Sequence, residues 1–222
     1  MQIFIYLIGF LYLAVIVFLA FYGIHNLIIP FLYLQRNSSA KTENTTPLIK
    51  KWPMVTIQLP IFNEKYTIER LLAAVTQLDY PSDRLQIQVL DDSTDDTTEL
   101  TRQLVDGYKA GGLNIECLHR DNRRGYKAGA LHDGFESARG EFIGIFDADF
   151  VPGRDWLRKI IPLFNDRKLG CLQTRWGHTN REYNSLTRAE ALAVDGHFIV
   201  EQTVRSQNDL FLNFNGTAGL WR

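Results

Sequence analysis

The stretch Phe142-Ile143-Gly144-Ile145-Phe146-Asp147-Ala148-Asp149 places two carboxylates directly behind a short apolar run. Such a run is typical of a strand that is covered on both faces of a parallel sheet. Residues i and i+2 of an extended chain project to the same side, so Asp147 and Asp149 can approach one site. Two carboxylates this close repel each other unless a cation lies near them, and oxygen ligands suit Mg²⁺ or Mn²⁺. The stretch therefore predicts a divalent cation site, the alternative being an acidic turn that caps a helix beginning near Arg154.

The segments around this stretch alternate between strand and helix patterns. Runs typical of strands lie at 54–59, 85–90, 115–118 and 142–146, with Pro60 expected to end the first. Patterns typical of helices lie at 68–78 and 126–138, and another helix is expected to follow Asp91-Asp92 and to run on through Leu104. A long helix is expected over 181–205. This alternation predicts an α/β fold with a doubly wound, mostly parallel sheet.

Three polar clusters follow strands of this sheet. They are Phe62-Asn63-Glu64, Asp91-Asp92 and Asp147-Ala148-Asp149. Because ligands of such sheets bind outside the carboxyl ends of the strands, we expect the three clusters to converge at one edge. A carboxylate in Asp91-Asp92 could accept hydrogen bonds from nucleobase nitrogens or ribose hydroxyls, and helix capping by Asp92 is compatible with that role.

A basic segment supplies the opposite charge. Residues 120–130 carry four cations and two glycines, and Lys127 or Arg124 could contact a diphosphate beside backbone N–H groups at a helix start. A solvated basic loop is the alternative. The glycine spacing and the Lys-Ser/Thr ending of a phosphate-binding P-loop are absent.

The first thirty-five residues contain no Asp, Glu, Lys or Arg, and 3–20 are apolar or aromatic apart from Gly9. This predicts a transmembrane segment at 1–35, the alternative being a very hydrophobic core helix. The cations Arg36, Lys41, Lys50 and Lys51 follow it and favour the cytoplasmic side. We therefore expect a linker at 36–51 and a catalytic domain at 52–222 that faces the cytoplasm from an inner, plasma or Golgi membrane.

Bulk composition narrows the partners and the redox state. The net charge of −1 gives no support for nucleic acid as a partner. Cys117 and Cys171 are far apart and have apolar neighbours, which predicts buried, reduced thiols. No Gly-x-Gly-x-x-Gly follows the first strand, which argues against a dinucleotide oxidoreductase.

Six motifs occur in the order found in family 2 glycosyltransferases. They are Gln58-Leu59-Pro60-Ile61-Phe62-Asn63-Glu64, Val89-Leu90-Asp91-Asp92-Ser93-Thr94-Asp95, Arg123-Arg124-Gly125-Tyr126-Lys127-Ala128-Gly129-Ala130-Leu131, Phe146-Asp147-Ala148-Asp149-Phe150, Gln173-Thr174-Arg175-Trp176 and Phe214-Asn215-Gly216-Thr217. From about Trp52 onward the chain resembles the cellulose-synthase-like branch of that family, especially its glucomannan (mannan) synthases.

The resemblance implies a GT-A fold, an inverting mechanism and a divalent cation. By resemblance, Asp92 with Asp91 would hold the base or ribose, Lys127 the diphosphate, and Asp149 with Asp147 the metal. The donor-binding residues it implies are Pro60, Asn63, Glu64, Asp91, Asp92, Lys127, Asp147 and Gln173, and Asp147 is also the catalytic candidate. The acceptor or sugar pocket it implies comprises Trp176, Asn215, Gly216 and Thr217, although Trp176 is equally suited to a buried aromatic position.

The implied function is transfer of a hexose from GDP-mannose or UDP-glucose to a growing β-linked polysaccharide at the membrane. Two alternatives stay open: transfer of a single sugar to a lipid, as in ceramide glucosyltransferases, and a nucleotide-sugar-binding membrane protein without catalysis. Family members place the general base and an acceptor-gripping Gln-x-x-Arg-Trp motif beyond the equivalent of Trp221-Arg222. The chain is therefore expected to be an N-terminal fragment.

Overall fold

A computed structural model describes residues 2–35, 49 and 51–222 of the chain, which form two compact units. The first comprises Met1–Glu43 and Arg175–Asn213, and the second, here called the sheet unit, comprises Asn44–Thr174 and Phe214–Arg222. Most of the predicted linker, including Arg36, Lys41 and Lys50, lies outside the described residues.

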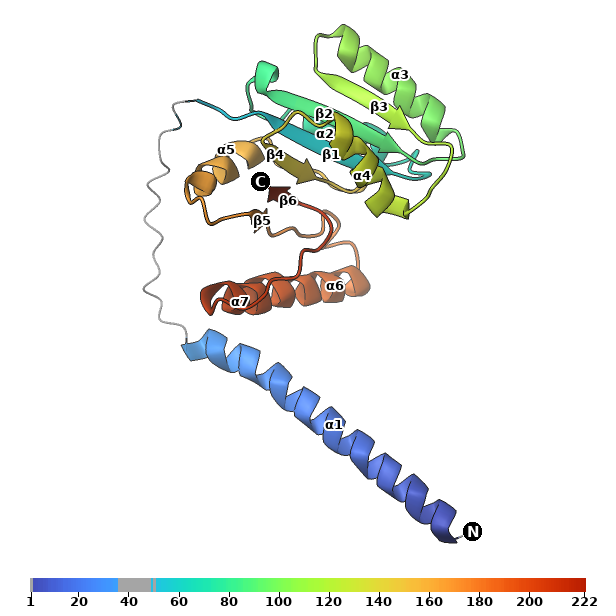
Figure 1. Ribbon diagram of the computed structural model, residues 1–222, viewed down its shortest axis with the longest axis vertical. Helices are drawn as coiled ribbons and strands as arrows, with labels where there is room; N and C mark the ends of the chain where they lie inside the picture. The colour runs from blue at the N-terminus through green and yellow to red at the C-terminus, as the bar shows by residue number, and fades with distance from the viewer. Residues whose placement is uncertain (1, 36–48, 50) are drawn as a thin grey trace. The chain divides into compact units, whose positions relative to one another are not determined.

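The sheet unit is built on a mixed, mostly parallel sheet, as predicted (Figure 1). Its strands are β1 (Val55–Ile61), β2 (Leu85–Asp91), β3 (Ile115–His119), β4 (Phe142–Ile145), β5 (Cys171–Gln173) and β6 (Gly219–Trp221). Their order is β3-β2-β1-β4-β6-β5, with β6 antiparallel to both of its neighbours. From β1 the chain adds β2 and then β3 on one side, and after β3 it crosses to β4 on the other side of β1. The point where the strand order reverses is where α/β sheets bind ligands.

Strand β1 does not end at Pro60, contrary to the sequence expectation. It pairs with β2 through Ile61, but with β4 only over Val55–Gln58. The carbonyls of Gln58 and Ile61 point to opposite sides, toward Phe146 and Asp92. The backbone of Pro60 points to the same side as that of Gln58, toward β4. Pro60 lies beyond the last residue that pairs with β4, so its missing N–H interrupts no hydrogen bond between the strands.

Helices cover both faces of the sheet. They are α2 (Ile68–Thr76), the short η1 (Ser82–Arg84), α3 (Thr97–Ala110), α4 (Tyr126–Ser137), α5 (Trp156–Ile160) and η2 (Ile161–Asn165). Helix α4 crosses one face so closely that a Cβ on Gly134 would lie 2.7 Å from the Leu90 side chain (Figure 1). On the other face, Trp156 of α5 packs edge-on against Phe146 with ring centroids 4.7 Å apart.

The sheet face under α4 contains a polar cluster, here called the glutamine layer, in which the residues from β1 and β2 are buried. Its members are Thr56, Gln58, Gln86, Gln88, Glu116 and Ser137. Gln58 Nε2 donates to Gln88 Oε1 at 3.1 Å, and Gln88 Nε2 donates to Ser137 Oγ at 2.8 Å. The alternate residues of the same strands, such as Ile57, Leu59 and Val89, are buried and apolar. The period of two in the strands therefore separates a polar face from an apolar one.

In the other unit, α6 (Ser185–Asp195), the π-helical η3 (Gly196–Gln202) and α7 (Thr203–Gln207) form the predicted long helix. It begins at Ser185 rather than at Arg181, because Asn184 and Thr187 form a capping box. Trp176 belongs to this unit and packs edge-on against Phe198, with ring centroids 5.4 Å apart.

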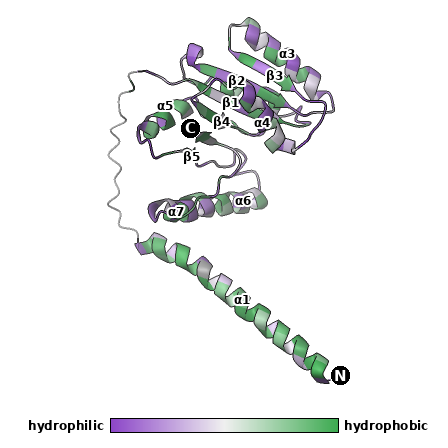
Figure 2. Cartoon of the chain, viewed as in Figure 1, coloured by the Kyte–Doolittle hydropathy of each residue, from purple (hydrophilic) through white to green (hydrophobic). Residues whose placement is uncertain are grey.

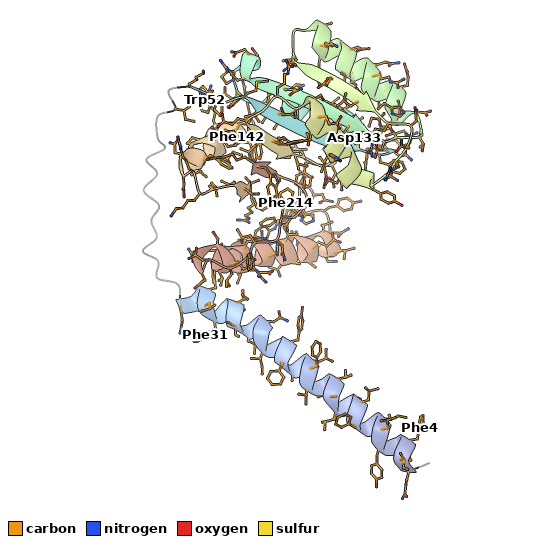
Figure 3. The ribbon with its side chains drawn as sticks, in the orientation of Figure 1. Phe4, Phe31, Trp52, Asp133, Phe142 and Phe214 are labelled. Carbon is orange, nitrogen blue, oxygen red and sulfur yellow. The ribbon has the colours of Figure 1, made fainter. Side chains whose placement is uncertain are left out.

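Helix α1 (Gln2–Gln35) is apolar on every side (Figure 2). Large side chains such as Phe4 and Phe31 point outward and are exposed (Figure 3). Among the described residues it is the one helix long and apolar enough to cross a membrane. Its 34 residues span roughly 50 Å, more than the bilayer core of about 30 Å.

The two cysteines are unpaired and lie on opposite edge strands of the sheet, Cys117 on β3 and Cys171 on β5. Both are half-buried, and burial raises the pKa of each thiol to about 11. Both thiols are therefore protonated near neutral pH.

Candidate functional site

A cavity of about 430 Å³ opens at the carboxyl ends of the central strands. It is lined by Pro60, Ile61, Phe62, Glu64, Asp92, Arg123, Lys127, Ala130, Asp147, Ala148 and Asp149. All three polar clusters predicted from the sequence contribute to it, through Glu64, Asp92 and the pair Asp147 and Asp149. The predicted convergence at one edge is therefore present.

A larger cavity of about 720 Å³ lies at the opposite, amino ends of β1 and β4, around Trp52, Met54 and Glu141. None of the predicted polar clusters reaches it. We place the candidate site in the smaller cavity, because in such sheets the chemistry follows the carboxyl strand ends rather than the cavity volume.

Lys127 and Asp147 form an ion pair in the smaller cavity. Lys127 Nζ also donates to the Gly216 carbonyl at 2.8 Å, and the Asp147 N–H donates to Thr217 Oγ1 at 3.0 Å. Gly216 has φ +82°, a left-handed conformation that glycine adopts without strain. The loop that contains Gly216 and Thr217, predicted as a sugar or acceptor contact, thus holds the Lys127–Asp147 pair in place.

Asp149 is exposed, and its carboxylate makes no ion pair among the described residues. No group of three or more His, Cys, Asp or Glu in the described part of the chain is placed to hold a metal by itself. Mg²⁺ and related cations are commonly bound by one or two carboxylates together with water and substrate phosphates. The donor set of Asp147 and Asp149 fits a cation that is completed by phosphate oxygens.

The adjacent carboxylates Asp91 and Asp92 have different surroundings. Asp91 is fully buried, and its Oδ1 accepts from the Ser93 N–H at 2.9 Å while its Oδ2 lies 2.8 Å from His119 Nδ1. Asp92 lines the cavity and is gripped by Arg120, whose Nε and Nη2 lie 2.7 and 2.6 Å from its two oxygens. Of the predicted pair, Asp92 is therefore the one placed to meet a ligand.

Arg120 was not singled out from the sequence. It directly follows β3, the neighbour of β2, and its Nη1 also donates to Asp133 of α4 at 2.9 Å. The hydrogen bond to Asp92 is the largest cause that raises the pKa of Arg120. The sequence did contain a signal for Arg120: it is a cation that directly follows β3, and β3 is the neighbour of β2, the strand that Asp92 follows.

Two other predicted donor residues hold loops together. Asn63 Oδ1 accepts from the Thr94 N–H at 2.9 Å, which joins the loops after β1 and β2. Gln173 Oε1 accepts from the Asn215 N–H at 3.0 Å, and Gln173 Nε2 donates to the Thr217 carbonyl at 3.0 Å. Neither Asn63 nor Gln173 lines the cavity, so their direct contact with a donor stays a prediction. Trp176 lies in the other unit, and its predicted contact with sugar also stays a prediction.

The basic segment contributes a residue that the sequence reasoning passed over. Arg123 lines the cavity together with Lys127, whereas the side chain of Arg124 is exposed and is not part of the lining. The guanidinium carbon of Arg123 lies 3.3 Å from the centroid of the Phe62 ring.

Residues 56–219 match the profile of "Glycosyl transferase family 2". The chain is 46% identical over 178 residues to "Glucomannan 4-beta-mannosyltransferase 1" of Cyamopsis tetragonoloba, covering 78% of this chain and 34% of that protein. It is 43% identical over 176 residues to "Glucomannan 4-beta-mannosyltransferase 7" of Arabidopsis thaliana, covering 77% and 32%. The chain thus spans about a third of the length of these curated relatives.

Among solved structures, the chain is similar to the mannosyltransferase PcManGT from Pyrobaculum calidifontis in complex with GDP-Man and Mn²⁺. The TM-score is 0.59 at 29% sequence identity, covering 72% of this chain and 45% of that one. S. aureus TarS shares the fold with a TM-score of 0.51 at 23% identity, covering 57% of this chain and 22% of that one. These likenesses support the GT-A-like architecture predicted from the motifs.

Proposed function

The chain belongs to glycosyl transferase family 2, and from this premise we propose that it binds GDP-mannose with Mg²⁺ or Mn²⁺ for transfer of mannose to a growing β-linked polysaccharide. The observation that carries the proposal is the convergence of Asp92, Lys127, Asp147 and Asp149 on one cavity at the strand ends. GDP-mannose is favoured over UDP-glucose because the relatives are mannosyltransferases and the similar solved structure holds GDP-Man and Mn²⁺.

Lys127 and Asp92 each keep a hydrogen-bonding group that is free to contact the nucleotide-sugar. Lys127 Nζ has three N–H groups and uses two of them on Asp147 and Gly216, so one can donate to a phosphate oxygen. Arg120 occupies one lone-pair direction on each oxygen of Asp92, which leaves acceptor sites for a base or ribose. These side chains would bind and orient the nucleotide end of the donor.

Asp147 and Asp149 would hold the divalent cation against the diphosphate. When bound, the cation supplies positive charge that neutralises the leaving nucleoside diphosphate. An inverting transfer also needs a general base for the acceptor hydroxyl. Asp92 and Asp147 are both paired with cations, so we assign the role of general base to neither of them.

The test is calorimetry of GDP binding to the detergent-solubilised full chain, with and without Mn²⁺. We expect Mn²⁺ to lower the dissociation constant of GDP by about tenfold or more. Asp149→Ala should remove this effect, because a metal ligand is lost. Asp106→Ala, an exposed aspartate on α3 outside the cavity, is the matched control and should leave the Mn²⁺ effect intact. Equal GDP affinity of the unsubstituted chain with and without Mn²⁺ would refute the proposal.

We also propose that α1 anchors the chain in a membrane, since its exposed side chains are apolar on every side. The chain is expected to stay in the membrane pellet after washing with alkaline carbonate, which strips proteins held by charge alone. Release of the chain into the supernatant would rule out a spanning helix.

A further inference from the structure

The guanidinium of Arg123 lies over an aromatic ring at the edge of the cavity. Its guanidinium carbon lies 3.3 Å from the Phe62 ring centroid and 5.2 Å from the Tyr126 ring centroid. Its Nε is shielded from solvent and finds no hydrogen-bond partner among the residues that the structure describes. Stacking on an aromatic face fixes the plane of a guanidinium, so the direction of its N–H groups is set before a ligand arrives.

Arg123 also differs from the other cation that lines the cavity. Lys127 is paired with Asp147, and the cavity carboxylate Asp92 is already paired with Arg120 from outside the lining. No carboxylate or carbonyl among the described residues accepts a hydrogen bond from the Arg123 guanidinium. Arg123 as a whole is half-buried, but its Nε is desolvated, and a desolvated donor without an acceptor is costly unless a ligand supplies one.

We propose that Arg123, stacked on Phe62, reads the nucleobase of the donor and favours guanine over uracil. The inference rests on the proposed function, because it names the part of the donor that this residue contacts. Guanine presents two adjacent acceptors, O6 and N7, which the planar fork of an arginine matches with two parallel hydrogen bonds. Uracil has no such adjacent pair, because its two carbonyl groups flank an N–H donor.

Asp92 completes the same recognition pattern. The N1–H group of guanine is adjacent to its O6 atom, with the amino group next to N1–H, so a base whose acceptors meet Arg123 turns these donors toward a nearby carboxylate. Asp92 lines the same cavity, is nearly buried, and is oriented by the two-point grip of Arg120. Arg123 as a hydrogen-bond donor and Asp92 as an acceptor, both held in one orientation, therefore complement guanine better than uracil.

The experiment measures dissociation constants of GDP, UDP and guanosine for the full chain by calorimetry in Mn²⁺. Arg123→Ala is expected to weaken GDP and guanosine by about 10- to 100-fold and UDP by less than about threefold, the range for loss of one bidentate arginine–guanine contact. Arg123→Lys keeps the charge but not the fork, so it should resemble Arg123→Ala. The matched control is Arg102→Ala, which removes an exposed cation on α3 outside the cavity and should change each constant by less than about twofold.

Several results would overturn the inference. These are an equal loss of GDP and UDP affinity in Arg123→Ala, unchanged guanosine binding, or full rescue by Arg123→Lys, since each indicates a phosphate contact or no contact. If Arg123→Ala fails to fold, Phe62→Leu loosens the stack instead and should lower the preference for GDP over UDP. Should the unsubstituted chain bind neither nucleotide, the proposed function itself fails; should it prefer UDP, only the guanine inference fails.

Discussion

Two polar clusters in the sheet unit contrast in how they use their hydrogen-bonding groups. In the glutamine layer, the side-chain amides of Gln58, Gln86 and Gln88 all donate to oxygens within the same unit. In the cavity at the strand ends, the Asp149 carboxylate and the Arg123 Nε have no such partner within the described part of the chain, and Lys127 has one N–H group left over. A buried polar network whose bonds are complete stabilises the fold, whereas unused capacity at a strand end is available to a ligand. The contrast predicts that substitutions in the first cluster change stability and those in the second change binding.

Arg120 should produce the largest effect, because it connects the cavity to the fold. Its side chain is 12% exposed and it bonds Asp92, which is 4% exposed. Arg120→Ala leaves a buried carboxylate unpaired, so we expect the free energy of unfolding to fall by about 3–5 kcal/mol, measured by urea denaturation. GDP affinity should fall as well, because Asp92 loses its fixed orientation.

Arg120→Lys separates the two effects. A lysine keeps the charge and should recover part of the stability, but it cannot hold both oxygens of Asp92, so GDP affinity should stay low. Arg102→Ala, an exposed arginine on α3, is the control and should change the unfolding free energy by less than about 0.5 kcal/mol. Normal GDP affinity in Arg120→Lys would show that Asp92 binds GDP without hydrogen bonds from Arg120 to both of its oxygens.

Gln88→Leu should have a smaller effect that is confined to stability. Gln88 is fully buried and bonds Gln58, Glu116 and Ser137. A leucine leaves the Gln58 amide without its acceptor, so we expect a loss of about 2–3 kcal/mol in the free energy of unfolding. The GDP dissociation constant of the folded protein should stay within about twofold of the unsubstituted value, measured by calorimetry.

Gln103→Leu on α3 serves as the comparison, since this glutamine is exposed and bonds only Glu99 in the described structure. Its unfolding free energy should change by less than about 0.5 kcal/mol. A Gln88→Leu protein that keeps its stability but loses GDP binding would break the distinction between the two clusters.

Much of the sheet could be predicted because its signals are local. The apolar run at 142–146 and the β-rich runs before it identified the strands, and the turn after each strand located the polar clusters. The extension of β1 past Pro60 was missed because it depends on where β4 stops pairing, which the sequence of β1 does not contain. The glutamine layer was missed for a related reason, since Gln58, Gln86 and Gln88 fit strand patterns without showing which face meets α4.

The sequence by itself determined the alternation of strands and helices, the apolar α1, and the acidic residues at three strand ends, because periodicity and residue type act over a few neighbouring positions. Only the tertiary structure decided which charges meet. Asp92 and Arg120 are 28 residues apart, and Lys127 and Asp147 are 20 apart. Parallel strands bring such distant positions to one edge, and the energy of a charge depends on its nearest partner in space rather than on its nearest neighbour in the chain. For that reason the place of Arg123 at the cavity, with no carboxylate partner among the described residues, became visible only in the folded chain.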